Sequence, residues 1–226
     1  MQPRELIGTA AVPGGEPLTL YRRGADYMIV LGRNELMSSR MSGSEIALAE
    51  MSCARLAKLG RTAPHLLVGG YGMGFTLRAA LAALGPAARI TVAELVPEII
   101  AWARGPMAEL AAGCLDDPRV RLVQRDVALV IGAAHGTYDA ILLDVDNGPD
   151  GLVRAANDRL YSAAGLAAAC AALKPGGVLA IWSAAPDPAF TRRLMQAGLA
   201  VEEVPVRARS NGKGPRHVIW FASRRR

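Results

Sequence analysis

The chain has 226 residues, 51% hydrophobic and 20% charged, and a formal net charge of +6 at pH 7. A chain of this length and composition is expected to bury one substantial core. A cytoplasmic location is expected because the sequence has neither a run of about 18 apolar residues for a membrane span nor an apolar leader. Much of the positive charge lies in the C-terminal stretch RSNGKGPRHVIWFASRRR, which is typical of a solvated chain end, so neither a membrane nor a nucleic acid is the expected partner.

The first 60 residues are predicted to form a hairpin and a helix. Residues 18–31, LTLYRRGADYMIVL, alternate loosely around Gly24 and Asp26, as a short hairpin does. The stretch SGSEIALAEMSCARLAKLG has helical spacing of apolar residues, with Ser44 as the expected N-cap and Gly60 as the stop. We assign residues 1–60 to an N-terminal hairpin and helix extension.

From Pro64 onward, short apolar runs alternate with helical segments. The expected strands are residues 66–68, 90–93, 120–123, 140–143 and the run VLAIWSA, and the expected helices include residues 75–84 and 97–112. This alternation predicts an α/β fold, in which a mostly parallel sheet carries helices on both faces. The last two runs, AGLAVEEVPVRAR and RHVIWFAS, are expected to pair through the SNGKG turn and give the sheet an antiparallel last strand.

A glycine-rich turn follows the first of these strands. It lies in HLLVGGYGMGFTLRAAL and contains Gly69, Gly70, Gly72 and Gly74. In doubly wound folds this turn makes the closest backbone approach to a ligand, although glycines alone are a weak signal. The turn lacks the G-x-x-x-x-G-K-[ST] pattern of a nucleotide triphosphate loop and the full G-x-G-x-x-G order of a dinucleotide binder.

Three acidic residues each follow an apolar run in chain order: Glu94, Asp126 and Asp144. A carboxylate at the end of the second strand can accept hydrogen bonds from ribose hydroxyls, and Asp126 is placed to border an adenine pocket. Together with the neighbouring Leu95 and Val127, they predict an adenosine-type ligand. With the dinucleotide pattern incomplete, S-adenosylmethionine or a relative ranks ahead of NAD.

The remaining cysteines, histidines and tryptophans are expected away from this site. The three cysteines are far apart and have no His or Cys neighbours at ligand spacing, so neither a disulfide nor a metal site is expected. None of the histidines, His217 among them, falls at the carboxyl end of an expected strand. Trp182 is expected in the core of the sheet.

Six segments, in order between residues 65 and 182, carry a family resemblance: LLVGGYGMGFTLRAAL, VAELVPEIIAWAR, DDPRVRLVQRDV, YDAILLDVDN, RLYS and LKPGGVLAIW. Together they resemble the spermidine and spermine synthase family, aminopropyltransferases built on the class I methyltransferase fold. The resemblance implies a Rossmann-like catalytic domain over residues 61–226, a ribose contact at Glu94, an adenine contact at Asp126 and a homodimer. It also implies that Asp144 is the base that deprotonates the attacking amine.

The sequence departs from the family on the polyamine side. Gly72 stands where the family's glycine turn has an Asp that holds a substrate ammonium, and Asn147 replaces the second Asp of the family's D-S-S-D-P loop. The segment SEIALAEM keeps the family's glutamates at Glu45 and Glu50 but has Leu48 and Ala49 where Tyr and His are usual.

These departures favour methyl transfer from S-adenosylmethionine to a small amine, hydroxyl or thiol acceptor. The cofactor's own carboxylate would be repelled by an Asp in the glycine turn and tolerated by Gly72. In this interpretation Asp144 is the base or orients the acceptor, Asn147 orients it by hydrogen bonds, and Tyr71 either walls the acceptor pocket or packs on the first helix. Two alternatives stay open: an aminopropyltransferase using decarboxylated S-adenosylmethionine, and a non-catalytic S-adenosylmethionine-binding module.

Overall fold

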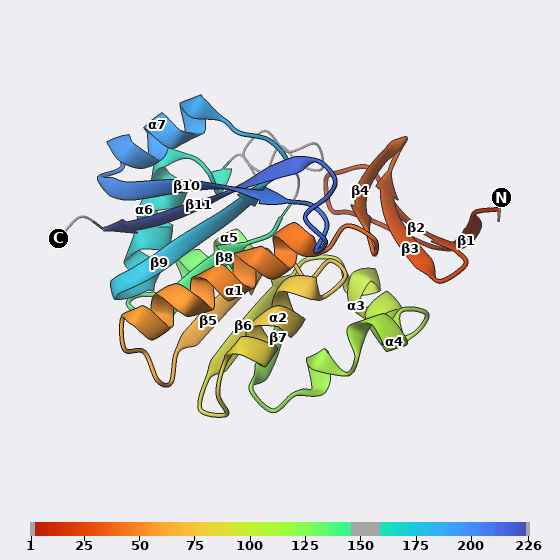
Figure 1. Cartoon of the computed structure of the whole chain (residues 1–226), viewed down its shortest axis with the longest axis horizontal. Coiled ribbons are helices and arrows are strands. Elements are labelled where there is room, and N and C mark those ends of the chain that lie inside the picture. Colours follow the sequence, from red (N-terminus) through yellow and green to blue (C-terminus); the bar gives the residue numbers. More distant parts are fainter. Residues whose placement is uncertain (1–2, 146–158, 225–226) are drawn as a thin grey trace.

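The computed structural model describes residues 3–145 and 159–224, and its main feature is a seven-stranded sheet in the order β10-β11-β9-β8-β5-β6-β7 (Figure 1). The strands are β5 (His65–Gly69), β6 (Arg89–Glu94), β7 (Val120–Gln124), β8 (Tyr138–Leu143), β9 (Leu173–Ser183), β10 (Leu199–Arg207) and β11 (Arg216–Arg224). Strands β5 to β9 pair in parallel, and β11 is antiparallel to both β9 and β10. The predicted mostly parallel α/β sheet is confirmed.

Helices cover both faces of this sheet and bury the apolar runs. One core contains residues of α1 (Gly43–Lys58), α2 (Phe75–Ala83) and α3 (Pro97–Arg104), and the other contains residues of α5 (Val127–Gly132), α6 (Ala163–Ala172) and α7 (Pro188–Gln196). Neighbouring residues of one strand enter opposite cores, as Ala140 and Ile141 do. Burial on both faces explains why the strands are continuous apolar runs rather than alternating ones.

The helix expected over residues 97–112 is interrupted. The structure instead has α3, which ends at Arg104, and a short α4 (Ala108–Ala111), followed by a 3-10 turn (Cys114–Asp116). Gly105 and Pro106 lie at the break, where proline has no backbone N–H to continue the helical hydrogen bonds.

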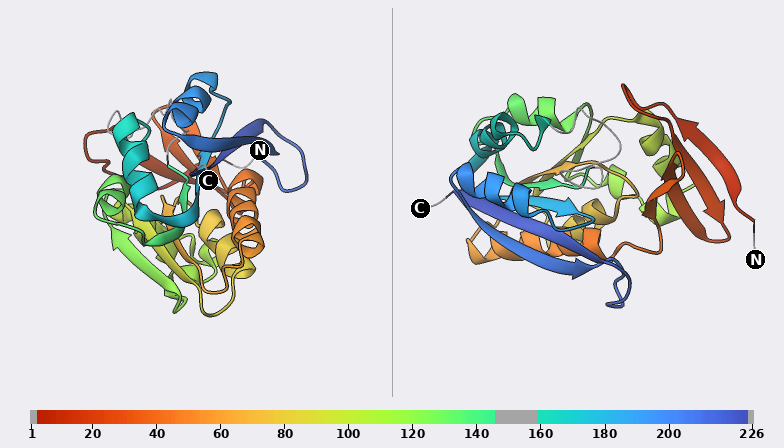
Figure 2. Two further views of the ribbon diagram at one scale, coloured as in Figure 1. Left: turned by 90° about the vertical axis from the view of Figure 1, so that its left-hand side faces the viewer. Right: turned by 90° about the horizontal axis from the view of Figure 1, so that it is seen from above.

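The N-terminal segment forms a four-stranded antiparallel sheet in the order β1-β2-β3-β4. Its strands are β1 (Glu5–Ala10), β2 (Leu18–Arg23), β3 (Asp26–Leu31) and β4 (Asn34–Ser38). The predicted hairpin is β2–β3, whereas β1 and β4 were not predicted. Figures 1 and 2 show this small sheet beside the carboxyl ends of the parallel strands, close to α3. The hydroxyl of Tyr27 donates to the carbonyl of Pro106, which ties the small sheet to the segment after α3.

Helix α1 begins differently from the prediction. Its N-cap is Ser42, whose side chain makes no capping hydrogen bond, and Ser44 lies inside the first turn. The Gly43 N–H donates to the Ala208 carbonyl at 2.8 Å, and a Cβ on Gly43 would lie 2.4 Å from the backbone of Arg209. The close approach of this backbone, which needs a glycine, therefore decides where the helix starts. Helix α1 packs against α2 and β9 of the larger unit. The division of the chain at residue 60 stays a prediction.

Within the part of the chain that the structure describes, no helix is both long enough and apolar enough to cross a membrane.

Candidate functional site

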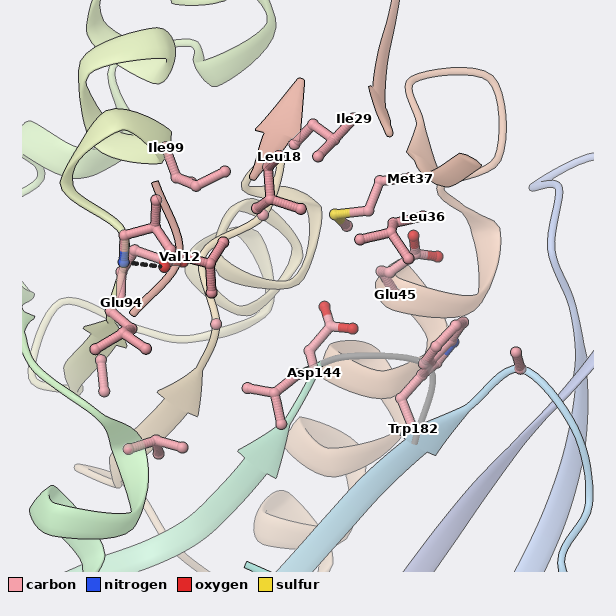
Figure 3. Close-up of a pocket in the computed structure, with 18 of the residues that line it drawn as sticks. Val12, Leu18, Ile29, Leu36, Met37, Glu45, Glu94, Ile99, Asp144 and Trp182 are labelled. Atoms are coloured by element: carbon pink, nitrogen blue, oxygen red, sulfur yellow. Dashed lines mark hydrogen bonds between the residues drawn. The ribbon is translucent and has the colours of Figure 1, made fainter. Parts of the chain in front are cut away.

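A cavity of about 330 Å³ lies at the carboxyl edge of the parallel strands, between the large sheet and the N-terminal sheet (Figure 3). The N-terminal sheet and its loops supply an apolar wall, formed by Val12, Leu18, Ile29, Leu36 and Met37. The opposite wall consists of the loops that follow β5, β6, β7 and β8, together with the end of β9 and the beginning of β11. This is the place where doubly wound folds bind their ligands.

The glycine turn forms part of the cavity wall. Gly70 and Gly72 line the cavity and have positive φ angles of 84° and 54°. A Cβ on Gly70 would lie 2.4 Å from the Asp144 carbonyl oxygen, so only glycine permits the turn to pass this close to β8. The other two glycines of the turn do not line the cavity. Gly69 ends β5 and packs against Val127, and Gly74 is the N-cap of α2.

Glu94 ends β6 and fixes the glycine turn. Its Oε2 accepts the N–H of Tyr71 at 2.9 Å, and its Oε1 accepts the N–H of Val96 at 2.8 Å. Burial raises the pKa of Glu94, and these backbone N–H groups oppose that effect. Each carboxylate oxygen has a second lone pair, so Glu94 can still accept hydrogen bonds from a ligand in the cavity that it lines with Leu95.

Asp126 has a structural contact of its own. It is the N-cap of α5, and its Oδ1 accepts the N–H of Ala128 at 2.9 Å. It also lines the cavity together with Val127, after β7, which pairs with the strand that ends at Glu94. The helix cap is therefore observed, and the contact of Asp126 with an adenine stays a prediction.

Asp144 follows the last residue of β8 and lines the cavity. The hydroxyl of Thr76, in the first turn of α2, donates to its Oδ2 at 2.6 Å. Burial raises the pKa of Asp144 to about 6, and the hydrogen bond from Thr76 opposes that rise. A carboxylate with this pKa is ionised at neutral pH and can still take up a proton during a reaction.

Tyr71 does not wall an acceptor pocket. Its side chain is buried outside the cavity, its hydroxyl lies 3.5 Å from Cys114 Sγ, and its ring sits over Gly74 at the start of α2. The structure therefore matches the packing alternative for Tyr71, and only its backbone N–H reaches the site, through Glu94. Met73 is likewise buried outside the cavity. Asn147 lies outside the described residues.

The cavity residues that were not predicted include Glu45, His217 and Trp182. Glu45 is only 5% exposed although it lies in the first turn of a surface helix. The sequence signal for it was present, since Glu45 shares helical spacing with the buried Leu48, Ala49 and Ser52. Burial and the nearby charge of Asp144 raise the pKa of Glu45 to about 8.

The prediction for His217 was wrong for a topological reason, whereas Trp182 lies in the core as predicted and also lines the cavity. Because β11 is antiparallel, its first residues lie at the edge where the parallel strands end, and Val218 pairs with Ser183 at the end of β9. His217 thereby faces the cavity, with its ring 4.9 Å from that of Trp182. The Nδ1 of His217 lies 2.9 Å from the hydroxyl of Ser44, which donates to Glu45 Oε2 at 2.7 Å.

The cavity is acidic. Five carboxyl groups line it, and no lysine or arginine does so among the described residues; the acidic lining residues are Glu35, Glu45, Glu94, Asp126 and Asp144. Figure 3 shows that Glu45 and Asp144 lie around the same part of the cavity, away from Glu94. None of the ion pairs found in residues 3–145 and 159–224 includes Glu45 or Asp144. Such a cavity favours a cationic ligand.

Comparison with known proteins gives a sequence family. Residues 57–200 match a family model described as the spermine/spermidine synthase domain. A protein of Mycobacterium tuberculosis named polyamine aminopropyltransferase is 36% identical over 148 residues, covering 62% of this chain and 27% of the relative. Polyamine aminopropyltransferase 1 of Streptomyces coelicolor is 33% identical over 127 residues, covering 54% and 23%. The chain thus spans about a quarter of the length of these curated relatives.

Solved structures share the fold. Spermidine synthase from Thermotoga maritima superposes with a TM-score of 0.76 at 17% identity, over 97% of this chain and 73% of that chain. A spermidine synthase in complex with the transition state analogue AdoDATO gives a TM-score of 0.74, also at 17% identity, over 97% and 72%.

The prediction of a methyltransferase that uses S-adenosylmethionine is wrong, because the relatives are named for aminopropyl transfer. The argument from Gly72 counted only the carboxylates lost from family positions, and it left out Glu45, which faces the same cavity as Asp144. The matched domain covers more than half of the sequence, and the chain belongs to the spermine/spermidine synthase family.

Proposed function

We propose that this protein transfers an aminopropyl group from decarboxylated S-adenosylmethionine to a small amine. The observation that carries the proposal is the acidic cavity, where Glu45 and Asp144 have no cationic protein partner among the described residues. Both substrates of this reaction are cations without a carboxylate, so a cavity lined only by acidic charge suits them and disfavours intact S-adenosylmethionine. The names of the relatives support the same reaction.

The adenosyl end of the donor is assigned to the loops after β5, β6 and β7. Glu94 would accept hydrogen bonds from the ribose hydroxyls through its remaining lone pairs, and Asp126 would border the adenine. Apolar contacts from Leu95 and Val127 would hold the base. The backbone of the glycine turn completes this side through Gly70 and Gly72, whereas Gly69 and Gly74, also predicted to bind the cofactor, do not line the cavity.

Asp144 is assigned as the base. The acceptor arrives as an ammonium ion and must lose a proton before its nitrogen can attack. Asp144 takes that proton, the nitrogen lone pair forms a bond to the aminopropyl carbon beside the sulfonium, and the C–S electron pair stays on sulfur. The products are a secondary ammonium ion, a neutral thioether nucleoside and one released proton. The protein's main contribution is alignment, since the sulfonium already activates the carbon.

The partners of the site follow from this chemistry. The acceptor is a small molecule with at least one primary amine. A homodimer, which the family resemblance implies, stays a prediction.

The direct test is a product assay by mass spectrometry. The protein is incubated with 1,4-diaminobutane and either decarboxylated or intact S-adenosylmethionine, and methylthioadenosine and the aminopropylated amine are quantified. We expect turnover with the decarboxylated donor alone. Asp144→Asn should reduce turnover at least a hundredfold, the usual order for losing a general base, whereas the matched variant Asp116→Asn, at a side chain 75% exposed, should not. Methylated product from the intact donor, or full activity of Asp144→Asn, would refute the proposal.

A further inference from the structure

Three observations around Glu45 call for an explanation. Its carboxyl group is buried, it faces the same part of the cavity as Asp144, and it has no cationic partner among the described residues (Figure 3). A buried carboxyl group without a cation is costly unless it holds a proton or a ligand supplies the charge. Glu45 is therefore placed either to be neutral in the free protein or to bind a cation.

Met37 occupies the space into which a side chain at residue 72 would project. A Cβ on Gly72 would lie 2.6 Å from the Sδ and 2.7 Å from the Cε of Met37, which projects from β4 into the cavity. At this point the cavity wall is therefore the uncharged thioether of Met37, where family members have a carboxylate at the position of Gly72. The other acidic residues of the cavity have protein partners: Glu94 accepts two backbone N–H groups, Asp126 caps α5, and Glu35 lies 4.0 Å from the Arg4 guanidinium.

A polar chain behind Glu45 suits its neutral form. In the structure Ser44 donates to Glu45 Oε2, and the same hydroxyl lies 2.9 Å from His217 Nδ1. When Glu45 carries a proton, it can donate to Ser44, and Ser44 can then donate to His217. Burial lowers the pKa of His217, which keeps its ring neutral and able to accept. The chain therefore supports Glu45 with or without its proton.

We infer that Glu45 is a substrate-binding carboxyl group that pairs with Asp144 around the ammonium of the acceptor, giving up its own proton as the amine enters. This inference rests on the proposed function and names a second acidic residue for the same site. The groups that face Glu45 are Asp144 after β8, Thr76 on α2, His217 on β11 and Glu35 on β4. The incoming cation favours the charged form of both carboxyl groups, so binding drives the proton out.

The linkage can be worked out from the two pKa values, about 8 for Glu45 and about 6 for Asp144. At pH 7 the free pair holds about one proton, nearly all of it on Glu45. The diamine arrives fully protonated and contributes none, since alkyl amines have pKa values of about 10. Binding should therefore release close to one proton at pH 7 and about half as much at pH 8.

The experiment is calorimetric titration of the protein with 1,4-diaminobutane in the presence of methylthioadenosine, in phosphate and in imidazole buffer. The difference between the two binding enthalpies gives the number of protons released, without any turnover. We expect about one proton for the native protein at pH 7 and nearly none for Glu45→Gln, which keeps the size of the side chain. Glu50→Gln, at an exposed position on the same helix, is the matched control and should behave as the native protein.

The outcomes separate the inference from the function. Diamine binding with no proton release from the native protein, or with unchanged release from Glu45→Gln, overturns the inference. Proton release without aminopropylated product supports the inference and refutes the proposed reaction. If Glu45→Gln does not fold, the native protein still decides, because its proton release must decrease as the pH rises above 7. Replacing the diamine with 1,4-butanediol should abolish binding, and equal binding of this uncharged analogue also overturns the inference.

Discussion

Removing the hydroxyl of Thr76 should shift the acid side of the pH–rate profile upward. Thr76 donates to Asp144 Oδ2 at 2.6 Å, and that hydrogen bond stabilises the ionised carboxylate. A hydrogen bond to a charged group contributes about 1.5–3 kcal/mol, and one pKa unit corresponds to about 1.4 kcal/mol. Thr76→Val should therefore raise the pKa of Asp144 from about 6 by roughly one to two units.

The sign of the effect follows from the role assigned to Asp144. The base must be ionised, so activity is lost as the pH falls through its pKa, and a higher pKa moves that loss to higher pH. The assay is kcat for aminopropyl transfer at saturating amine, measured from pH 5 to pH 9, so that the proton lost by Glu45 on amine binding does not enter the profile. Thr76→Ser keeps the hydroxyl and is the matched control, with a profile close to the native one. An acid limb that does not move in Thr76→Val, or that moves equally in both variants, would refute the reasoning.

Two further predictions test the adenosyl side and the glycine turn. Glu94→Ala should weaken the binding of methylthioadenosine by about 1–3 kcal/mol, or roughly five- to 150-fold, because the ribose loses its charged acceptor. Calorimetry measures the affinity, and an unchanged affinity would show that the ribose is bound elsewhere. Tyr71→Phe should leave kcat within about twofold and lower the free energy of unfolding by about 1 kcal/mol or less, because among the described residues its hydroxyl has one hydrogen-bond partner, Cys114. A tenfold fall in kcat with an intact fold would show that the Tyr71 hydroxyl takes part in the reaction.

The sheet could be predicted because its signals are local. The central strands β5, β6 and β8 contain continuous apolar runs, and the acidic residue at the end of a run, such as Glu94, marks the ligand edge without any knowledge of distant contacts. The start of α1 shows the opposite case. Ser44 has the side chain of an N-cap, yet the contact between Gly43 and the segment around Arg209 sets the first turn two residues earlier. That contact joins segments far apart in sequence, so no local pattern contains it.

The same distinction explains the missed residues of the site. His217 was placed away from the cavity because carboxyl ends of strands were searched, but an antiparallel strand brings its amino end to that edge. The sequence did predict the antiparallel last strand, so the position of His217 followed from it and was overlooked. The partner of His217 is different, because Ser44 reaches it only through the packing of α1 against the large sheet.

The error over methyl transfer has a more general cause. Charge selectivity belongs to the whole cavity, because a carboxylate acts over several ångströms and any wall can supply it. Comparing positions one at a time showed a carboxylate missing at residue 72, but the space beside Gly72 is filled by Met37 from another sheet, and Glu45 faces the same cavity from α1. A substitution that removes a charge at one site residue therefore predicts a changed ligand only when the other walls are known to supply no charge in its place.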